Sequence, residues 1–187
     1  MTSSSPRAAL PLLANYHHVA FRCRDAEETR HFYQDILGLP LAAGLAFDEI
    51  AGTKLNYMHL FFQLGDGNYL AFFDAPDTAT EEHFKPKSGF NRHIAIEAPN
   101  LEALGTYQQH LQQHGIRCDG PLDHGFVRSI YFYDPNGLNV EITARTPEHD
   151  GIMAHEFSQA AREIKTWTQA TLATKQARGL HMESTKA

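Results

Sequence analysis

Apolar and polar residues alternate along several short stretches of the chain, which is the pattern of β-strands with one buried face. In residues 18–23, Val19, Phe21 and Cys23 fall on one side, and the residues between them fall on the other. The apolar side of such a strand has to be covered, and a helix that follows it in the sequence is predicted to cover it.

Two helices are predicted from their end residues. One begins at Asp25, with Glu28 three residues later at the spacing of a capping box, and it ends at Gly38. The other begins at Asn100 and ends at Gly115. Three more strands are predicted after each helix. The last two of each set meet at a tight turn, and these turns are residues 65–67 and 135–137.

The chain contains an internal repeat. Residues 18–25, His-Val-Ala-Phe-Arg-Cys-Arg-Asp, match residues 93–100, His-Ile-Ala-Ile-Glu-Ala-Pro-Asn, at an offset of 75. Residues 60–67 match residues 130–137 at an offset of 70. A difference of this size between the two offsets is one that surface loops absorb. Each copy therefore reads as a strand, a helix and three strands.

This pattern predicts an α+β fold with two tandem βαβββ modules that form an open, cup-shaped sheet, followed by a long amphipathic helix. The predicted parts are a flexible tail (1–14), a first module (15–75), a linker (76–90), a second module (91–146), a C-terminal helix (147–179) and a second tail (180–187).

The C-terminal helix is indicated by apolar and small residues at helical spacing. They are Met153, Phe157, Ala160, Ile164, Trp167 and Thr171. The apolar side of this helix must be buried against its own sheet or against a second subunit. The helix favours a homodimer, and packing on its own sheet is the alternative.

Composition excludes several classes of function. The chain of 187 residues carries a formal charge of −6, so it lacks the basic surface that nucleic acid or an anionic membrane requires. No apolar run reaches the roughly 20 residues of a membrane span. Two cysteines do not make a disulfide framework, and a reducing cytoplasm is the expected location. The 12 histidines point to metal binding or to acid–base chemistry.

Three of the possible metal-binding residues fall at matching places in the repeat. His18 and His93 occupy equivalent strand positions, on the face opposite to the apolar one. Glu141, in the last strand of the second copy, faces the same way because its apolar neighbours face the other way, whereas the first copy has Ala71 at that position. Two imidazoles and one carboxylate leave coordination positions open, as in a catalytic Fe(II), Mn or Zn site.

The same stretches resemble a known family. The matching motifs are His18-Val-Ala-Phe, Phe32-Tyr-Gln-Asp-Ile-Leu-Gly-Leu, His93-Ile-Ala-Ile and Ile130-Tyr-Phe-Tyr-Asp-Pro-Asn-Gly-Leu-Asn-Val-Glu141. They are similar to those of the vicinal oxygen chelate superfamily, which includes glyoxalase I, extradiol ring-cleavage dioxygenases, fosfomycin-resistance enzymes, methylmalonyl-CoA epimerase and bleomycin-binding proteins. The resemblance spans residues 16–145 and implies His18, His93 and Glu141 as metal ligands.

Within this superfamily, the fosfomycin-resistance enzymes share the ligand set of two His and one Glu with the extradiol dioxygenases. The string Ile130-Tyr-Phe-Tyr-Asp-Pro-Asn-Gly ahead of Glu141 resembles the dioxygenases in addition, so the dioxygenase branch is favoured. The resemblance implies Fe(II), with Mn, Ni and Zn as alternatives, and a small, catechol-like aromatic substrate that reacts with dioxygen. It also implies that Tyr131 lies near the substrate oxygens and that His83 or His124 transfers a proton. Four phenylalanines are candidates either for the wall of the cup or for the core, namely Phe61, Phe62, Phe72 and Phe73.

Two other functions remain open at this point. One is a non-oxidative isomerase, epimerase, lyase or thiol transferase of the same superfamily. The other is a metal-free protein that binds a small aromatic molecule in the same cup.

Overall fold

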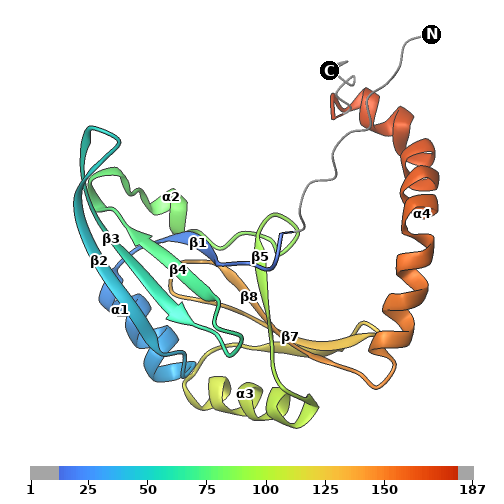
Figure 1. Ribbon diagram of the computed structural model, residues 1–187, viewed down its shortest axis with the longest axis horizontal. Helices are drawn as coiled ribbons and strands as arrows, with labels where there is room; N and C mark the ends of the chain where they lie inside the picture. Colours follow the sequence, from blue (N-terminus) through green and yellow to red (C-terminus); the bar gives the residue numbers. More distant parts are fainter. Residues whose placement is uncertain (1–12, 181–187) are drawn as a thin grey trace. The chain divides into compact units, whose positions relative to one another are not determined.

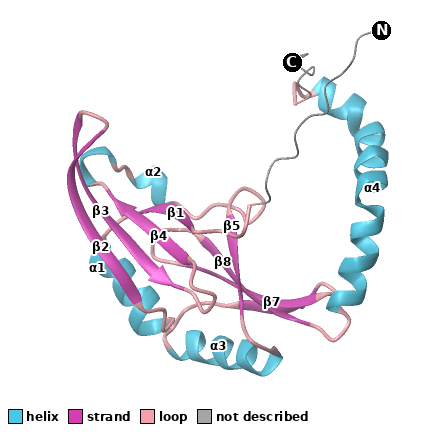
Figure 2. Cartoon of the chain, in the orientation of Figure 1, coloured by secondary structure: helices cyan, strands magenta, loops and turns pink. Residues whose placement is uncertain are grey.

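The computed structural model describes residues 13–180, so most of each predicted tail lies outside the described residues. The first copy of the repeat forms β1 (His18–Cys23), α1 (Ala26–Arg30), the π-helix η1 (His31–Ile36), β2 (Leu41–Ile50), β3 (Thr53–Gln63) and β4 (Tyr69–Asp74) (Figures 1 and 2). The second copy forms β5 (His93–Glu97), α3 (Leu101–Gln113), β6 (Asp119–Asp123), β7 (Val127–Tyr133) and β8 (Asn139–Arg145). The α+β class and both βαβββ modules are confirmed.

The segments outside the modules also contain helices. The linker contains the short 3₁₀ helix η2 (Pro76–Thr78) and the one-turn helix α2 (Glu81–Phe84). The predicted C-terminal helix is confirmed as α4 (His149–Ala177). Within the described residues, we find no helix with the length and apolar character needed to cross a membrane.

Each copy contributes one four-stranded mixed sheet. The strand orders are β1-β4-β3-β2 and β5-β8-β7-β6. In the first sheet, β1 runs parallel to β4, and β3 runs antiparallel to both of its neighbours. The outer strand β2 has two irregularities in its pairing with β3, which is common at the edge of a sheet.

The predicted start of the first helix is confirmed. The Asp25 carboxylate accepts a hydrogen bond from the Glu28 backbone N–H at 2.8 Å. The helix then widens into η1, where the Leu37 N–H donates to the Phe32 carbonyl five residues earlier. Both Phe32 and its neighbour Tyr33 are buried, so the wide turn places two consecutive aromatic side chains in the core.

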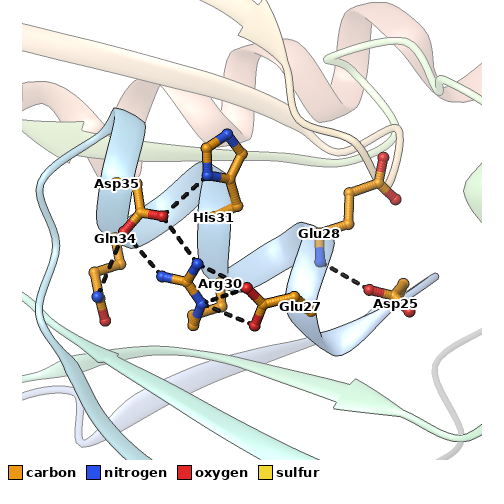
Figure 3. A network of polar contacts seen from close by, with 7 residues as sticks. All are labelled: Asp25, Glu27, Glu28, Arg30, His31, Gln34 and Asp35. Atoms are coloured by element: carbon orange, nitrogen blue, oxygen red, sulfur yellow. Dashed lines mark hydrogen bonds and ion pairs between the residues drawn. The ribbon is translucent and has the colours of Figure 1, made fainter.

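The outer surface of this helical segment carries an ion-pair network (Figure 3). Arg30 donates to both carboxylate oxygens of Glu27 and to both of Asp35, and the His31 ring lies 3.0 Å from Asp35. The hydrogen bond from Arg30 lowers the pKa of Asp35 well below its usual range, and the His31 contact lowers it further. Because these groups face solvent, we assign them a local role in joining α1 to η1.

A buried polar network holds the turn of the second copy against the helix of the first. The Tyr33 hydroxyl donates to Asp134 at 2.9 Å, and both residues are buried. Asp134 also accepts hydrogen bonds from the backbone and side-chain N–H groups of Asn136 and from the Leu138 backbone N–H. The Asn136 side chain reaches Thr29 at 3.2 Å. Buried polar groups are stable when paired in this way.

The chain divides into two compact units, each assembled from separate segments. The first takes in the described residues up to Ile94, together with His110–Arg117 and Phe132–Val140. The second takes in Ala95–Gln109, Cys118–Tyr131 and the described residues from Glu141 onward. The Tyr33–Asp134 network lies wholly within the first unit.

Candidate functional site

His18 lies on the face of the first sheet that is opposite to the core. Strand pairing places it beside Tyr69, and places His59 beside Phe73 and Phe61 beside Ala71. Phe61 and Phe73 therefore share the face of His18, whereas Phe62 and Phe72 are fully buried and contact Tyr33 on the other face. The strand alternation thus separates the four phenylalanines into two that line the open face and two that form the core.

An unbroken row of aromatic rings covers this open face within the first unit. The ring centroids are separated by 5.0 Å (Phe47–Tyr57), 5.9 Å (Tyr57–Phe73), 3.8 Å (Phe73–His59), 4.1 Å (His59–Phe61) and 5.6 Å (Phe61–His18). Phe47, at one end of the row, is 44% exposed. Such a row offers flat apolar surface to a planar ligand.

His59 lies on the same face of the first sheet, at the position that the repeat aligns with Ser129 in the second copy. In the structure it stacks on Phe73 with an interplanar angle of 23°, and its centroid lies 6.1 Å from that of His18. Its Nε2 is buried and has no hydrogen-bond partner among the described residues. Burial lowers the pKa of His59, and the charge of His18 lowers it further.

The two predicted histidine ligands each make a contact through Nδ1. His93 Nδ1 lies 2.7 Å from the Gly89 carbonyl oxygen, so it carries the proton and Nε2 is the acceptor nitrogen of the ring. His18 Nδ1 lies 2.9 Å from His17 Nδ1, and when His18 is the donor its Nε2 is likewise an acceptor. A carbonyl on Nδ1 is the usual arrangement around a metal-binding imidazole.

The third predicted ligand belongs to a hydrogen-bonded chain in the second unit. The Tyr131 hydroxyl donates to Glu141 Oε1 at 3.1 Å, and His124 Nε2 lies 2.8 Å from the same hydroxyl oxygen. Glu141 is buried, whereas His124 is exposed. The structure thus brings together three residues that sequence reasoning had proposed separately.

The direction of these hydrogen bonds follows from the chemistry of the groups. Burial raises the pKa of Tyr131, a hydrogen bond from Ser129 lowers it, and the charge of Glu141 raises it again, with a net increase. The hydroxyl therefore stays protonated at neutral pH and has a single proton to donate. Because that proton goes to the Glu141 carboxylate, His124 must be the donor to the Tyr131 oxygen.

His83, the other candidate for proton transfer, lies in α2. Its Nδ1 accepts a hydrogen bond from the Thr80 backbone N–H at 3.0 Å and also lies 3.0 Å from the Thr80 hydroxyl. The backbone contact is one half of a capping box, in which the Thr80 side chain accepts from the His83 backbone N–H. Its catalytic role stays a prediction, and the structure supplies a local reason for a histidine at this position.

His18 and His93 belong to the first unit and Glu141 to the second. Across the described residues, we find no group of three or more His, Cys, Asp or Glu side chains arranged to hold a metal ion. The donor set of two imidazoles and one carboxylate nevertheless has the chemistry that a divalent ion requires, and His93 has the fitting tautomer. The metal ligands stay a prediction.

Comparison with known proteins identifies the family. The family model described as Glyoxalase/Bleomycin resistance protein/Dioxygenase superfamily matches residues 15–142. The uncharacterized protein YwkD of Bacillus subtilis (strain 168) is 27% identical over 133 residues, which cover 70% of this chain and 97% of YwkD.

Solved structures agree with this match. A glyoxalase/dioxygenase from Nostoc punctiforme is 26% identical with a TM-score of 0.53, covering 74% of this chain and 99% of that one. The fosfomycin resistance protein FosX from Listeria monocytogenes, complexed with Mn(II) and sulfate, shares the fold at 19% identity and a TM-score of 0.54, covering 74% and 98%. Because the family model covers well over half of the sequence, the chain belongs to the glyoxalase/bleomycin resistance protein/dioxygenase superfamily.

Proposed function

We propose that this chain is a metal-dependent enzyme of the extradiol dioxygenase type, which acts on a small aromatic substrate with two adjacent oxygens. Its proposed metal ligands are His18, His93 and Glu141. The observation that carries the proposal is the hydrogen-bonded chain from His124 through Tyr131 to Glu141, because it joins a predicted ligand to two groups that can transfer a proton.

A divalent ion such as Fe(II), when bound by these three residues, would supply Lewis-acid and redox chemistry. The protein's part is to fix the ligands. The hydrogen bond from Tyr131 orients the Glu141 carboxylate, and the Gly89 carbonyl fixes the tautomer of His93. Groups that hold a ligand in this way typically change metal affinity or activity by about 10–100-fold when they are removed.

The chain of hydrogen bonds also has a use in proton transfer. A hydroxylated aromatic substrate has to lose a proton before its oxygen becomes a good electron donor. With its own proton donated to Glu141, the Tyr131 oxygen can accept a hydrogen bond from such a hydroxyl, and the exposed His124 can exchange a proton with solvent. The phenol then acts as a bridge between a buried reaction centre and the surface.

The aromatic row on the first sheet supports the substrate class. Planar rings such as Phe61 and Phe73 stack favourably on an aromatic ligand, whereas a polar, flexible ligand gains little from contact with them. This preference is consistent with a catechol-like molecule.

The proposal is tested by loading anaerobically purified protein with Fe(II) and adding a panel of catechols in air. We expect oxygen uptake that matches substrate loss, together with a coloured ring-fission product. Glu141→Ala should lose the metal, as measured by elemental analysis. Tyr131→Phe should lower turnover by about 10–100-fold, whereas Tyr133→Phe, on the same strand, should leave it unchanged because the Tyr133 hydroxyl donates to the Lys87 backbone carbonyl. Absence of turnover with every iron-loaded catechol mixture would contradict the proposal.

A second candidate is a non-oxidative isomerase or lyase of the same superfamily. The similarity to the Nostoc protein, described as a glyoxalase/dioxygenase, favours it as much as the first. It predicts tight binding of manganese, nickel or zinc and no oxygen uptake, with Tyr131 moving a proton between substrate atoms. A metal-free binding protein is the remaining alternative, and it predicts ligand binding that Glu141→Ala leaves unchanged.

A further inference from the structure

Helix α4 has no part in the function proposed above. It begins after residue 142, where the family match ends, and it continues for 29 residues, or about 43 Å at 1.5 Å per residue. It belongs to the second unit, and its start contacts the rest of that unit: Ile152 lies against Gly125, and the His149 ring contacts Phe126. None of its residues is buried by the part of the chain that the structure describes.

The exposed side of α4 carries large apolar residues at a regular spacing. Phe157 is 88% exposed, Ile164 67%, Trp167 65% and Met153 44%. The apolar and small residues follow one another at steps of four, three, four, three and four, namely Met153, Phe157, Ala160, Ile164, Trp167 and Thr171. This is the heptad pattern of a coiled-coil seam, with Phe157 and Ile164 at a positions and Ala160 and Trp167 at d positions.

The charges on α4 argue against a membrane as the partner. A helix that lies on an anionic lipid surface is rich in Lys and Arg on its polar side. Here the two signs are balanced: the acidic residues are Asp150, Glu156 and Glu163, and the basic ones are Arg162, Lys165 and Lys175. A narrow apolar seam with mixed flanking charges fits another helix of the same kind.

We propose that α4 is a dimerisation helix that pairs in parallel with α4 of a second copy of this chain. In parallel register, each g residue faces an e residue five positions further on in the second copy. Glu156 then faces Ala161, and Glu163 faces Thr168, so no like charges meet.

The antiparallel alternative is less favourable. The antiparallel alignment that pairs Phe157 with Trp167 and Ile164 with Ala160 brings Glu163 next to Glu163 of the second copy. Like charges that face each other across a coiled coil are destabilising and select against that arrangement.

The apolar surface on α4 is about what a specific dimer needs. At 150–250 Å² for a buried aromatic side chain, Phe157 and Trp167 would together cover roughly 300 Å² per chain. Ile164 and Met153 add to this, so two helices approach the ~1,000 Å² lower limit of specific interfaces. We therefore expect a dimer of micromolar rather than nanomolar affinity.

Sedimentation equilibrium of the full chain over about 1–100 μM tests the proposal. We expect a monomer–dimer equilibrium that Ile164→Glu weakens by roughly 30-fold or more, the effect of losing a central interface residue. Gln169→Glu is the matched control, because it adds the same charge at an f position on the opposite side of the helix. Circular dichroism at 222 nm verifies that α4 is still helical in both variants.

Orientation is tested by a cysteine at the seam. In a parallel dimer, Ala160→Cys places two introduced thiols side by side, and mild oxidation should give a covalent dimer; Cys118→Ser removes the background thiol. A wild-type chain that stays monomeric throughout this range, or a dimer that Ile164→Glu leaves intact, would overturn the proposal. A dimer that fails to cross-link would overturn the parallel arrangement.

Discussion

The buried hydrogen bond between Tyr33 and Asp134 gives the sharpest test of how this fold is held together. Tyr33→Phe removes only the hydroxyl, because the ring contacts with Phe72 at 4.8 Å and Phe62 at 5.3 Å are kept. Oδ2 of Asp134 then loses the donor at 2.9 Å and, among the described residues, keeps the Asn136 side-chain amide. The variant therefore leaves a buried carboxylate with one partner fewer.

The size of the effect follows from this loss. A hydrogen bond to a charged group contributes about 1.5–3 kcal/mol to stability. At about 2–4 °C per kcal/mol for a chain of this length, the melting temperature should fall by roughly 3–12 °C.

The effect should also depend on pH. Burial raises the pKa of Asp134 above its usual value of 3.8, although several hydrogen bonds lower it. The folded state thus binds this proton more tightly than the unfolded chain does, and the free energy of unfolding falls as the pH rises through the folded pKa. Tyr33→Phe removes a donor to the charged form and raises that pKa further. The destabilisation should therefore be complete at neutral pH and should shrink on acidification.

Urea unfolding followed by circular dichroism is the appropriate assay, because the single tryptophan, Trp167, lies in α4 and not in the compact unit that contains this network. Protein concentration must be held constant, since self-association would add to the measured stability. Tyr16→Phe, at a side chain that is 80% exposed, is the control and should cause no change. A loss below about 0.5 kcal/mol, or one that is the same at acid and neutral pH, would refute the reasoning.

Three other predictions concern single positions. Gly137→Ala would press its Cβ against the Phe84 carbonyl oxygen at a φ of +72°, whereas the repeat-equivalent Gly67, at a φ of +84°, has open space. In urea unfolding, we expect Gly67→Ala to lower the free energy of unfolding by about 1–2 kcal/mol and Gly137→Ala to lower it by about 1–3 kcal/mol more. Equal losses for the two variants would contradict this reasoning. Cys23, whose pKa burial raises to about 12, should react with a thiol reagent at pH 8 only after the protein unfolds, and rapid labelling of the native protein would show otherwise. Asp25→Ala should lower the free energy of unfolding by about 1 kcal/mol, because it removes the N-cap of α1, and an unchanged urea midpoint would exclude that role.

The architecture was predictable because the periodicity and the repeat agree. The capping residues located both helices of the modules, and the alternation within β1 correctly assigned Cys23 to the covered face. The contact between Tyr131 and Glu141 was also predictable in principle. The two residues are each five positions from Asn136 at the centre of the turn, so an antiparallel hairpin places them opposite each other.

Other features depend on tertiary contacts that no local pattern encodes. The position of His124 depends on the irregular pairing of β6 with β7, where the register shifts between Asp119 and Leu122. The capping role of His83 depends on a one-turn helix within a segment that reads only as a polar linker. The π-helical turn η1 was not predicted from the sequence, in which the segment reads as ordinary helix; in the structure Phe32 and Tyr33 are both buried there.

The two copies of the repeat differ in the environment of the turn before their last strand. In the first copy the turn residue Asp66 is exposed and accepts hydrogen bonds from the backbone and side chain of nearby Asn68. In the second copy, Asp134 and Asn136 are buried against the helix of the first copy, with Tyr33 as the central donor. A copy folded alone would leave either the Tyr33 hydroxyl or the Asp134 carboxylate without its partner, at the cost of an unsatisfied buried polar group. The sequence repeat is therefore not a pair of independent folding units, which agrees with the assignment of residues 132–140 to the same compact unit as the first copy.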